Sequence, residues 1–240
     1  TQVVFNNDGT KMFIVNHAGR KSVDYYSLST AFDVSTATRD DDDEYFISGQ
    51  EPRANTIAFN NDGTRMFIAG AGGNNKLHRI HEYSLSTGFD LSSTVTHLNT
   101  EDLSSTHDYI DGITFKDDGT KMYTIRGSEH DNKISQFKLT TPYDVSTLSL
   151  EGTFDVSSVS ADSREVVFSN DGSKMFIIDD SNDKVHEFNL SCNWSVIDGA
   201  CDDPITTSDG GKDILSSIES QTATAKQIAI HATTPVLNRM

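Results

Sequence analysis

The sequence has few cysteines, which cross-link small secreted domains, and no long apolar segment of the kind that spans a membrane. Only two cysteines and four prolines occur among its 240 residues, which excludes a fold held by several disulfides. No apolar run approaches the roughly 20 residues of a membrane-spanning helix. Basic residues are also scarce, since 19 Lys and Arg stand against 36 Asp and Glu. The net charge of −17 disfavours nucleic acid and anionic membrane surfaces as partners.

What the sequence does contain is an internal repeat built from two phrases. The first phrase, "FNNDGTKMFI", begins at Phe5 and returns with few changes at Phe59, Phe115 and Phe168. The second, "YSLSTAFDVST", begins at Tyr26 and returns at Tyr83, Phe137 and, in decayed form, Phe188. Copies of the first phrase are 53 to 56 residues apart, so one unit fills the whole period. A fixed period of this size is typical of repeat architectures.

Each unit alternates short apolar runs with turn residues, as strands do. In the second unit, residues 56–59 form one run, "NNDG" forms a turn, and residues 64–70 form a second, alternating run. Asp-Gly between two such runs predicts a tight hairpin, because glycine accepts the positive φ of the turn without steric cost. A third strand is expected in "KLHRIHEYSL" and a weaker fourth near "STVTHLN".

Four antiparallel strands in each of four units predict an all-β fold, a β-propeller of four-stranded antiparallel blades. We expect the blades at about residues 1–54, 55–110, 111–162 and 163–200, as the repeat period indicates. The recurring Phe and Met positions then form the core between blades, and Trp194 fills the aromatic slot of the fourth blade. Four blades either close a small ring or form an open arc of a larger one. A solenoid is the rival architecture.

The combination of "FxxDGTKMF" with "YxLSTxFDVST" resembles the propeller-type repeats of predicted surface and phage-associated proteins of marine bacteria. The resemblance covers about residues 1–190 and is nearly silent on the ligand, because such propellers host many unrelated functions. It implies an extracellular or bacterial cell-surface location. Since Thr1 lies inside an expected strand, we also expect a longer parent protein, whose further sequence can hold a secretory signal and additional blades.

Beyond the repeats the sequence changes character. Residues 201–211, "CDDPITTSDGG", are typical of a linker. From Lys212, apolar residues recur at three- and four-residue steps, which predicts a short amphipathic helix and tail over residues 212–240. The apolar face of this helix needs a partner, which is the propeller, another copy or a missing segment; its residues are Ile214, Ile218, Ala225 and Ile228.

The C-terminal stretch "SIESQTATAKQIAIHATTPVLNRM" carries a second resemblance. It is similar to the segment that leads from a passenger into a C-terminal membrane barrel in some alphaproteobacterial surface proteins. This resemblance implies an autotransporter-like passenger fragment.

The two cysteines, Cys192 and Cys201, lie nine positions apart at the end of the last repeat. A disulfide between them would pin the end of the fourth blade and would imply an oxidising compartment. Two reduced cysteines are the alternative. A zinc site is disfavoured, because His and Cys do not cluster with ligand spacing.

A binding site is expected on one face of the propeller. The loops between second and third strands and the loops between blades share a face, because every strand reverses direction. These loops differ between copies, whereas the Asp-Gly turns on the opposite face are nearly identical, as expected where loops carry function on a rigid scaffold. Loops without function vary as well, so an unused face is the alternative. The candidate ligand-binding residues are His17, Arg20, Asn55, Asn74, Asp111, His130, Arg164 and Asp180.

The chemistry of these side chains leaves several ligands open. Asp111 and Asp180 favour hydroxyl-bearing ligands or calcium, whose protein ligands are oxygens. Arg20 and Arg164 favour carboxylate or sulfate groups, which suit bidentate guanidinium contacts. Neither the loop acids nor the histidines show a complete metal-site spacing, so metal ligands stay unassigned and calcium is an open option rather than an assigned cofactor.

These observations favour an extracellular or cell-surface binding module that recognises a protein or polysaccharide without catalysis, because no nucleophile and base pair can be identified. The alternative from a different class is a cation-dependent propeller hydrolase or lyase with inward-facing His, Asp or Glu. A structural spacer in a surface protein is the third hypothesis.

Overall fold

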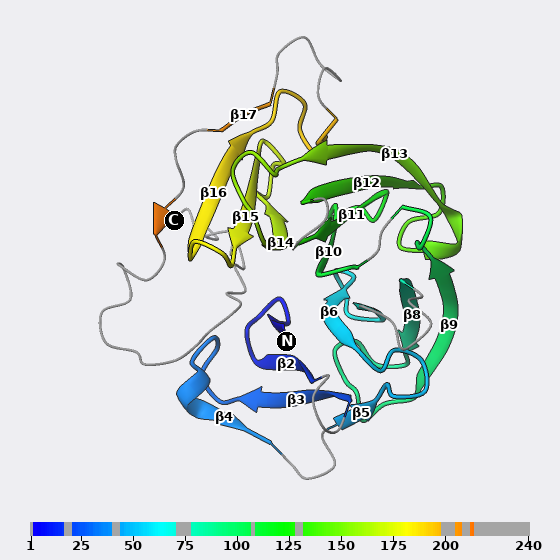
Figure 1. The fold of residues 1–240 in the computed structure, drawn as a ribbon. Helices are drawn as coiled ribbons and strands as arrows, with labels where there is room; N and C mark the ends of the chain where they lie inside the picture. The colour runs from blue at the N-terminus through cyan, green and yellow to red at the C-terminus, as the bar shows by residue number, and fades with distance from the viewer. Residues whose placement is uncertain are drawn as a thin grey trace, which may run out of the picture.

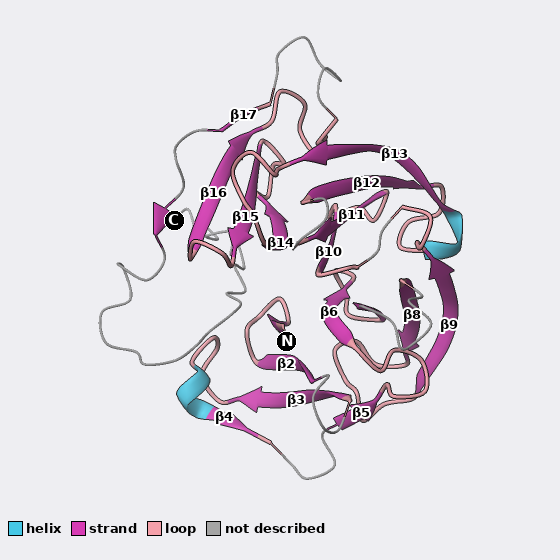
Figure 2. Ribbon diagram, in the orientation of Figure 1, coloured by secondary structure: helices cyan, strands magenta, loops and turns pink. Residues whose placement is uncertain are grey.

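The structure is a computed structural model, and it describes residues 2–16, 21–39, 44–70, 78–106, 109–127, 132–197, 205–207 and 212–213. The chain forms four small antiparallel sheets arranged around a common axis (Figure 1). Within the described ranges, the helical residues are those of two single turns of 3₁₀-helix, η1 (Val34–Thr36) and η2 (Val145–Thr147), on the outer side of the ring (Figure 2). The expected all-β propeller with four blades is confirmed.

Blades 1 and 2 are meanders that run from the axis outward. Blade 1 consists of β1 (Val3–Phe5), β2 (Lys11–Asn16) and β3 (Ser22–Leu28), with β4 (Ala37–Thr38) and β5 (Glu44–Phe46) both paired to β3 at the outer edge. Blade 2 consists of β6 (Ala54–Phe59), β7 (Arg65–Gly70), β8 (Arg79–Leu85) and β9 (Val95–Asp102).

Blade 3 repeats the pattern and blade 4 departs from it at its outer edge. Blade 3 consists of β10 (Gly112–Phe115), β11 (Lys121–Arg126), β12 (Lys133–Leu139) and β13 (Leu148–Asp155). Blade 4 consists of β14 (Ser163–Phe168), β15 (Lys174–Asp179) and β16 (Lys184–Asn189), followed by β17 (Thr206–Thr207) and β18 (Lys212–Asp213), which both pair with β16.

Two expectations were wrong at the outer edge of blade 4. Residues 206–207 lie in the segment expected to be a linker, and residues 212–213 were expected to begin a helix, yet both are short strands along β16. The physical reason is the open edge of β16, whose backbone groups need partners once the fourth repeat has decayed. Residues 214–240, where the rest of the helix was predicted, lie outside the described residues.

The first phrase forms the hairpin between the first two strands of every blade. Its Phe and Met face each other in the same register in all four copies, as in Phe59↔Met66. The turn glycines have φ between +68° and +71°, the left-handed region that glycine enters without strain. The turn aspartate caps the turn: Asp62 Oδ1 accepts hydrogen bonds from the backbone N–H of Thr64 at 2.9 Å and from its hydroxyl at 2.5 Å.

The second phrase folds its aromatic residue onto that turn. In blade 2, a Cβ added to Gly63 would lie 2.2 Å from Cδ2 of Phe89, so the ring covers the bare face of the glycine. The backbone N–H of Phe89 also donates to the Gly63 carbonyl at 3.0 Å. The same aromatic-on-glycine contact recurs in every blade, with Phe32 on Gly9, Tyr143 on Gly119 and Trp194 on Gly172. The first phrase therefore supplies the glycine of this contact, and the second phrase supplies the aromatic ring.

Blades pack against each other through a repeated aromatic pair. The second-strand aromatic of one blade contacts the first-strand Phe of the next, with ring centroids 4.3 to 4.6 Å apart in Phe13–Phe59, Phe67–Phe115 and Tyr123–Phe168. Each pair lies in one of three apolar clusters, which join blades 1 and 2, blades 2 and 3, and blades 3 and 4. None of these clusters of described residues joins blade 4 to blade 1.

We predict that Gly63→Ala destabilises the protein, because the new methyl group would meet the Phe89 ring and because alanine is strained at a φ of +71°. The expected loss is about 2 kcal/mol or more of unfolding free energy, measured by urea denaturation. Gly49→Ala is the matched control, since nothing lies within 4 Å of a Cβ there. Equal effects of the two substitutions would contradict the aromatic-on-glycine account.

Candidate functional site

A chain of hydrogen bonds crosses the propeller axis and links all four blades. The Gln2 amide nitrogen donates to Glu165 Oε2 at 2.5 Å, and the Gln2 amide oxygen accepts from the Thr56 hydroxyl at 2.9 Å and from Ile57 N–H at 2.6 Å. The Thr56 oxygen in turn accepts from Ile113 N–H at 3.1 Å. These groups are buried, so blades 1, 2, 3 and 4 meet at the axis through polar contacts.

The residues of this axial chain were not among the predicted site residues, although the sequence contains a signal for them. Its residues occupy the position three before each first-strand Phe, which is Gln2, Thr56, Gly112 and Glu165 in the four copies. Polar residues and glycine recur there in an otherwise apolar strand, and buried polar side chains require partners. Gly112 leaves room for Glu165, whose Oε1 would lie 2.7 Å from a Cβ at that position.

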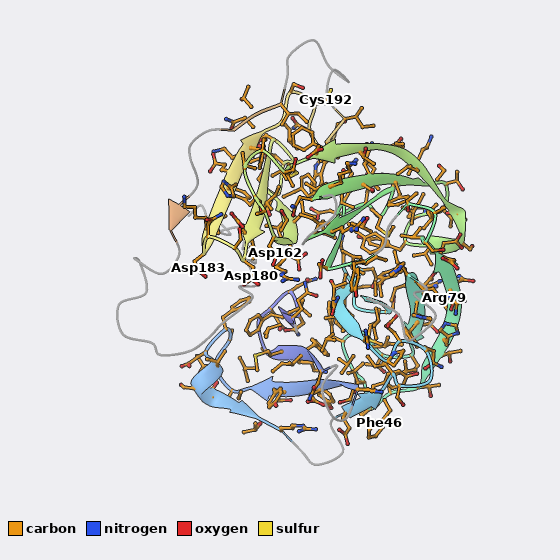
Figure 3. The ribbon with its side chains drawn as sticks, viewed as in Figure 1. Phe46, Arg79, Asp162, Asp180, Asp183 and Cys192 are labelled. Carbon is orange, nitrogen blue, oxygen red and sulfur yellow. The ribbon has the colours of Figure 1, made fainter. Side chains whose placement is uncertain are left out.

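Beside this chain, four acidic and amide side chains gather around one arginine. The guanidinium of Arg164 donates to Asp162 Oδ2 at 2.6 Å, to Asp180 Oδ2 at 3.3 Å and to Asp111 Oδ1 at 3.4 Å. The amide of Asn55 also donates to Asp111 Oδ1 at 3.4 Å. We call these five residues the axial cluster. Figure 3 shows Asp162 and Asp180 together at the end of blade 4 that lies toward the middle of the ring.

The strand ends place these side chains. Asn55 and Arg164 belong to the first strands of blades 2 and 4, Asp111 immediately precedes the first strand of blade 3, and Asp180 follows the second strand of blade 4. First strands begin and second strands end at the same face, so the four side chains converge. The backbone supports the cluster, because Asp180 N–H donates to the Asp162 carbonyl at 2.8 Å and Gly127 N–H donates to Asp111 Oδ2 at 2.9 Å.

The cluster holds more negative than positive charge. Burial raises the pKa of Asp111, and the Gly127 N–H and the Arg164 guanidinium offset only part of this shift. Burial also raises the pKa of Asp162, and the neighbouring Asp180 and Asp179 carboxylates add to the shift against the opposing effect of Arg164. Burial alone would lower the pKa of Arg164, but the three carboxylates raise it above its ordinary value. The guanidinium therefore stays charged while the acids compete for it.

A buried aspartate–histidine pair lies next to the cluster in blade 4. Asp179 is fully buried and accepts hydrogen bonds from Ser181 N–H at 3.1 Å, the Ser181 hydroxyl at 2.6 Å and the Asn182 amide at 2.9 Å. Its Oδ2 is 3.3 Å from Nε2 of His186. Burial would raise the pKa of Asp179, yet these hydrogen bonds lower it below the ordinary value. Asp179 is thus a satisfied structural carboxylate that orders the loop after β15.

The structure brings together the four candidate residues that it describes, Asn55, Asp111, Arg164 and Asp180, and it adds Asp162. The other four candidates, His17, Arg20, Asn74 and His130, lie outside the described residues. Whether the assembled residues bind a ligand stays a prediction.

Neither a metal nor a membrane helix is indicated within the described ranges. No group of three or more His, Cys, Asp or Glu side chains there is arranged to hold a metal ion, so calcium stays an untested prediction. In the same ranges no helix has the length and apolar character needed to cross a bilayer.

Cys192, in the described part of the chain, is disulfide-bonded. Cys201, the partner expected from the sequence, lies outside the described residues. The Cys192–Cys201 pairing therefore stays a prediction.

Comparison with known proteins supports the fold and nothing finer. No family model and no curated protein sequence matches the chain. Among solved structures, a "putative 6-phosphogluconolactonase" from Bacteroides uniformis is similar with a TM-score of 0.57 at 11% identity, over 88% of this chain and 54% of that one. Its counterpart from Bacteroides fragilis gives 0.56 at 12% identity with the same coverage. The periplasmic gluconolactonase of Pseudomonas aeruginosa gives 0.53 at 16% identity, over 79% and 49%.

These neighbours are similar in architecture to this chain, which spans about half of their length. At such identities the similarity shows a propeller fold and carries no residue role to this chain.

We predict that Arg164→Met lowers the unfolding free energy by about 2 kcal/mol near neutral pH, because it leaves three carboxylates without their shared cation. The pKa values of Asp111 and Asp162 are raised in the folded state and would rise further in the variant. A raised folded-state pKa favours the folded state as pH falls, so the deficit should shrink between about pH 7 and about pH 5.

Urea denaturation at both pH values measures this effect. Arg79→Met, on the opposite side of the ring in Figure 3, is the control and should show a smaller, pH-independent change. A deficit for Arg164→Met that stays constant with pH would mean that the arginine does not neutralise the cluster.

Proposed function

We propose that this propeller is a non-catalytic binding module whose axial cluster receives a cationic group of a partner protein or polymer. The observation that carries the proposal is the charge of the cluster: three carboxylates surround one guanidinium. Fully ionised, they leave a surplus of negative charge at a place where the strand ends of blades 2, 3 and 4 meet.

The geometry narrows the ligand chemistry that the sequence left open. Arg164 was expected to favour carboxylate or sulfate ligands, but its Nε and both terminal nitrogens already donate to Asp180, Asp111 and Asp162. A bidentate guanidinium contact with an external anion would require breaking these bonds. An ammonium or guanidinium group on the partner would instead supply the missing positive charge.

The partner surface is expected to be basic for a second reason. The whole chain carries a net charge of −17, which attracts cationic partners over distances up to about one Debye length and accelerates their encounter. We therefore favour a basic protein surface, with an amine-bearing polysaccharide as the second option. The proposed location is extracellular or at the bacterial cell surface, in line with the resemblance of the repeats.

A hydrolase is the second candidate function, supported by the lactonase names of three similar structures. A phosphorylated lactone would meet repulsion at the acidic axial cluster, whereas an uncharged lactone would not. In a hydrolase of this kind, Asp111 or Asp162 would act as the acid or base, because their raised pKa values bring protonation closer to neutrality. A purely structural spacer is the third candidate and predicts no ligand.

Binding of tetralysine peptide, measured by isothermal titration calorimetry, tests the proposed function. We expect tetralysine to bind, tetraglutamate and maltotetraose not to bind, and the affinity to fall with added salt. Asp180→Asn should weaken tetralysine binding about tenfold through loss of one close charge pair, whereas Glu101→Gln, on outer strand β9, should not change it.

Three outcomes oppose the proposal. Equal losses for the two variants would place binding elsewhere on the acidic surface. Absence of tetralysine binding would favour the spacer. Turnover of glucono-δ-lactone that disappears in Asp111→Asn would favour the hydrolase.

Acidification offers an independent check of the same site. Because Asp111 and Asp162 have pKa values above the ordinary 3.8, their charge is lost at higher pH than that of an exposed aspartate. Tetralysine affinity should therefore begin to decline at a higher pH than that at which exposed aspartates titrate. A decline that follows the titration of exposed aspartates would contradict the assignment.

A further inference from the structure

The two ends of the blade array carry the same apolar positions as the internal interfaces but bury them less. Phe176 of blade 4 occupies the second-strand position that Phe13, Phe67 and Tyr123 occupy in blades 1 to 3, as the strand registers show. The three equivalents are fully buried, whereas Phe176 is half-buried. Val185 is likewise half-buried, whereas its equivalents Val23, Ile80 and Ile134 are fully buried.

The other end shows the complementary pattern. In blades 2 to 4 the residues that face the preceding blade include Met66, Ile68 and Tyr83 or their equivalents, and these are buried. Their counterparts in blade 1 are Met12, which keeps 8% exposure, and Ile14 and Tyr26, which are half-buried. We call Phe176, Ile178 and Val185 the leading face of blade 4, and Phe5, Met12, Ile14 and Tyr26 the trailing face of blade 1.

These two faces differ from an ordinary exposed surface. Each is one half of the interface that forms the three apolar clusters between blades, so each is shaped to pack against apolar side chains. Apolar side chains that stay half-buried at positions buried elsewhere in the repeat indicate a surface that can pack against further apolar groups. The axis itself is already occupied by the Gln2–Glu165 contact between blades 1 and 4, so the occupant must pack outside it.

The path of the chain points to its own C-terminal segment as that occupant. Strand β18 pairs Lys212 with Val185 and Asp213 with Lys184, so the last described residues of the chain lie along the strand that contributes Val185 to the leading face. The 27 residues that follow Asp213 include Ile214, Leu215, Ile218, Ile228, Ile230, Val236 and Leu237. The segment also carries Lys226 and Arg239 against the single acid Glu219, so its side chains have a net positive charge in a chain that is otherwise strongly acidic.

We propose that residues 214–240 dock between the leading face of blade 4 and the trailing face of blade 1 and close the ring. Apolar residues of the segment, with Ile218 and Ile228 central to it, cover Phe176 and Val185 on one side and Ile14 and Tyr26 on the other. The positive charge of the segment offsets part of the acidity of the blades. This contact is independent of the ligand proposed for the axial cluster.

Hydrogen exchange in the full-length chain tests the docking. In Ile218→Asp/Ile228→Asp, backbone amides of residues 3–14 and 176–185 should exchange about tenfold faster than in the parent, because their cover is lost. Ser216→Asp/Gln227→Asp adds the same charge to the same segment and should leave these amides unchanged. Amides of residues 113–125, at internal interfaces, should be unaffected in both variants.

Equal exchange in the two variants would overturn the proposal. A second measurement removes the dependence on variant folding: a benzophenone photo-crosslinker at position 228 of the full-length chain should form crosslinks within one molecule to residues 3–14 or 176–185. Crosslinks to other blades would overturn the docking. Crosslinks between molecules, with a dimeric mass in solution, would show instead that a second copy covers the two faces.

Discussion

The contact between the turn glycine and the aromatic residue of the second phrase organises every blade. In blade 2, Phe89 covers Gly63 and at the same time packs against Phe59 at 5.2 Å and against Phe13 of blade 1 at 6.3 Å. The inner hairpin, the outer loop and the blade interface thus share one ring. Because the ring takes the place of a side chain at position 63, the glycine is required for packing as well as for its backbone conformation. The aromatic residues accept a φ of +54° to +60°, a strain that this packing must offset.

The fold could be predicted from the sequence because the first phrase carries the glycine of this contact and the second carries the aromatic residue. The Asp-Gly turn and the aromatic residue of the second phrase recur in the same order in each unit, 22 to 26 residues apart, and so do the strands between them. Four residues of the axial cluster were also predictable, since strand direction alone brings Asn55, Asp111, Arg164 and Asp180 to one face. Gln2 was missed because its partners lie in other blades, and the recurring polar position that it occupies does not show which groups it meets. Asp162 was missed although it contacts Arg164, only two positions away. The prediction that a helix begins at Lys212 was wrong. The spacing of apolar residues reports only local preference, whereas Lys212 and Asp213 pair with the open edge of β16, which local spacing does not reveal.

Two groups of aspartates in this protein, those of the hairpin turns and two of the axial cluster, have pKa shifts in opposite directions. The turn aspartates accept hydrogen bonds from neighbouring hydroxyl and N–H groups; the Ser169 hydroxyl and the Ser173 N–H, for example, lower the pKa of Asp171 to about 2. Burial does the opposite at Asp111 and Asp162. Turn aspartates therefore contribute stability that is present above their unfolded pKa and lost as pH falls through the folded value. The axial cluster instead loses its internal repulsion on acidification, so the two classes respond to acid with opposite signs.

The Gln2 side chain at the axis also limits the number of blades in the ring. Packing between blades is generic, because one aromatic pair serves all three interfaces, and by itself it would tolerate another repeat. The Gln2 side chain, however, reaches Thr56 of blade 2 and Glu165 of blade 4 at once. An additional blade between them would move these groups beyond the span of a single amide and take from a buried carboxylate the donor that Gln2 supplies. Duplication of a repeat, otherwise an easy route to a longer protein, would thus demand a simultaneous change of side chains at the axis.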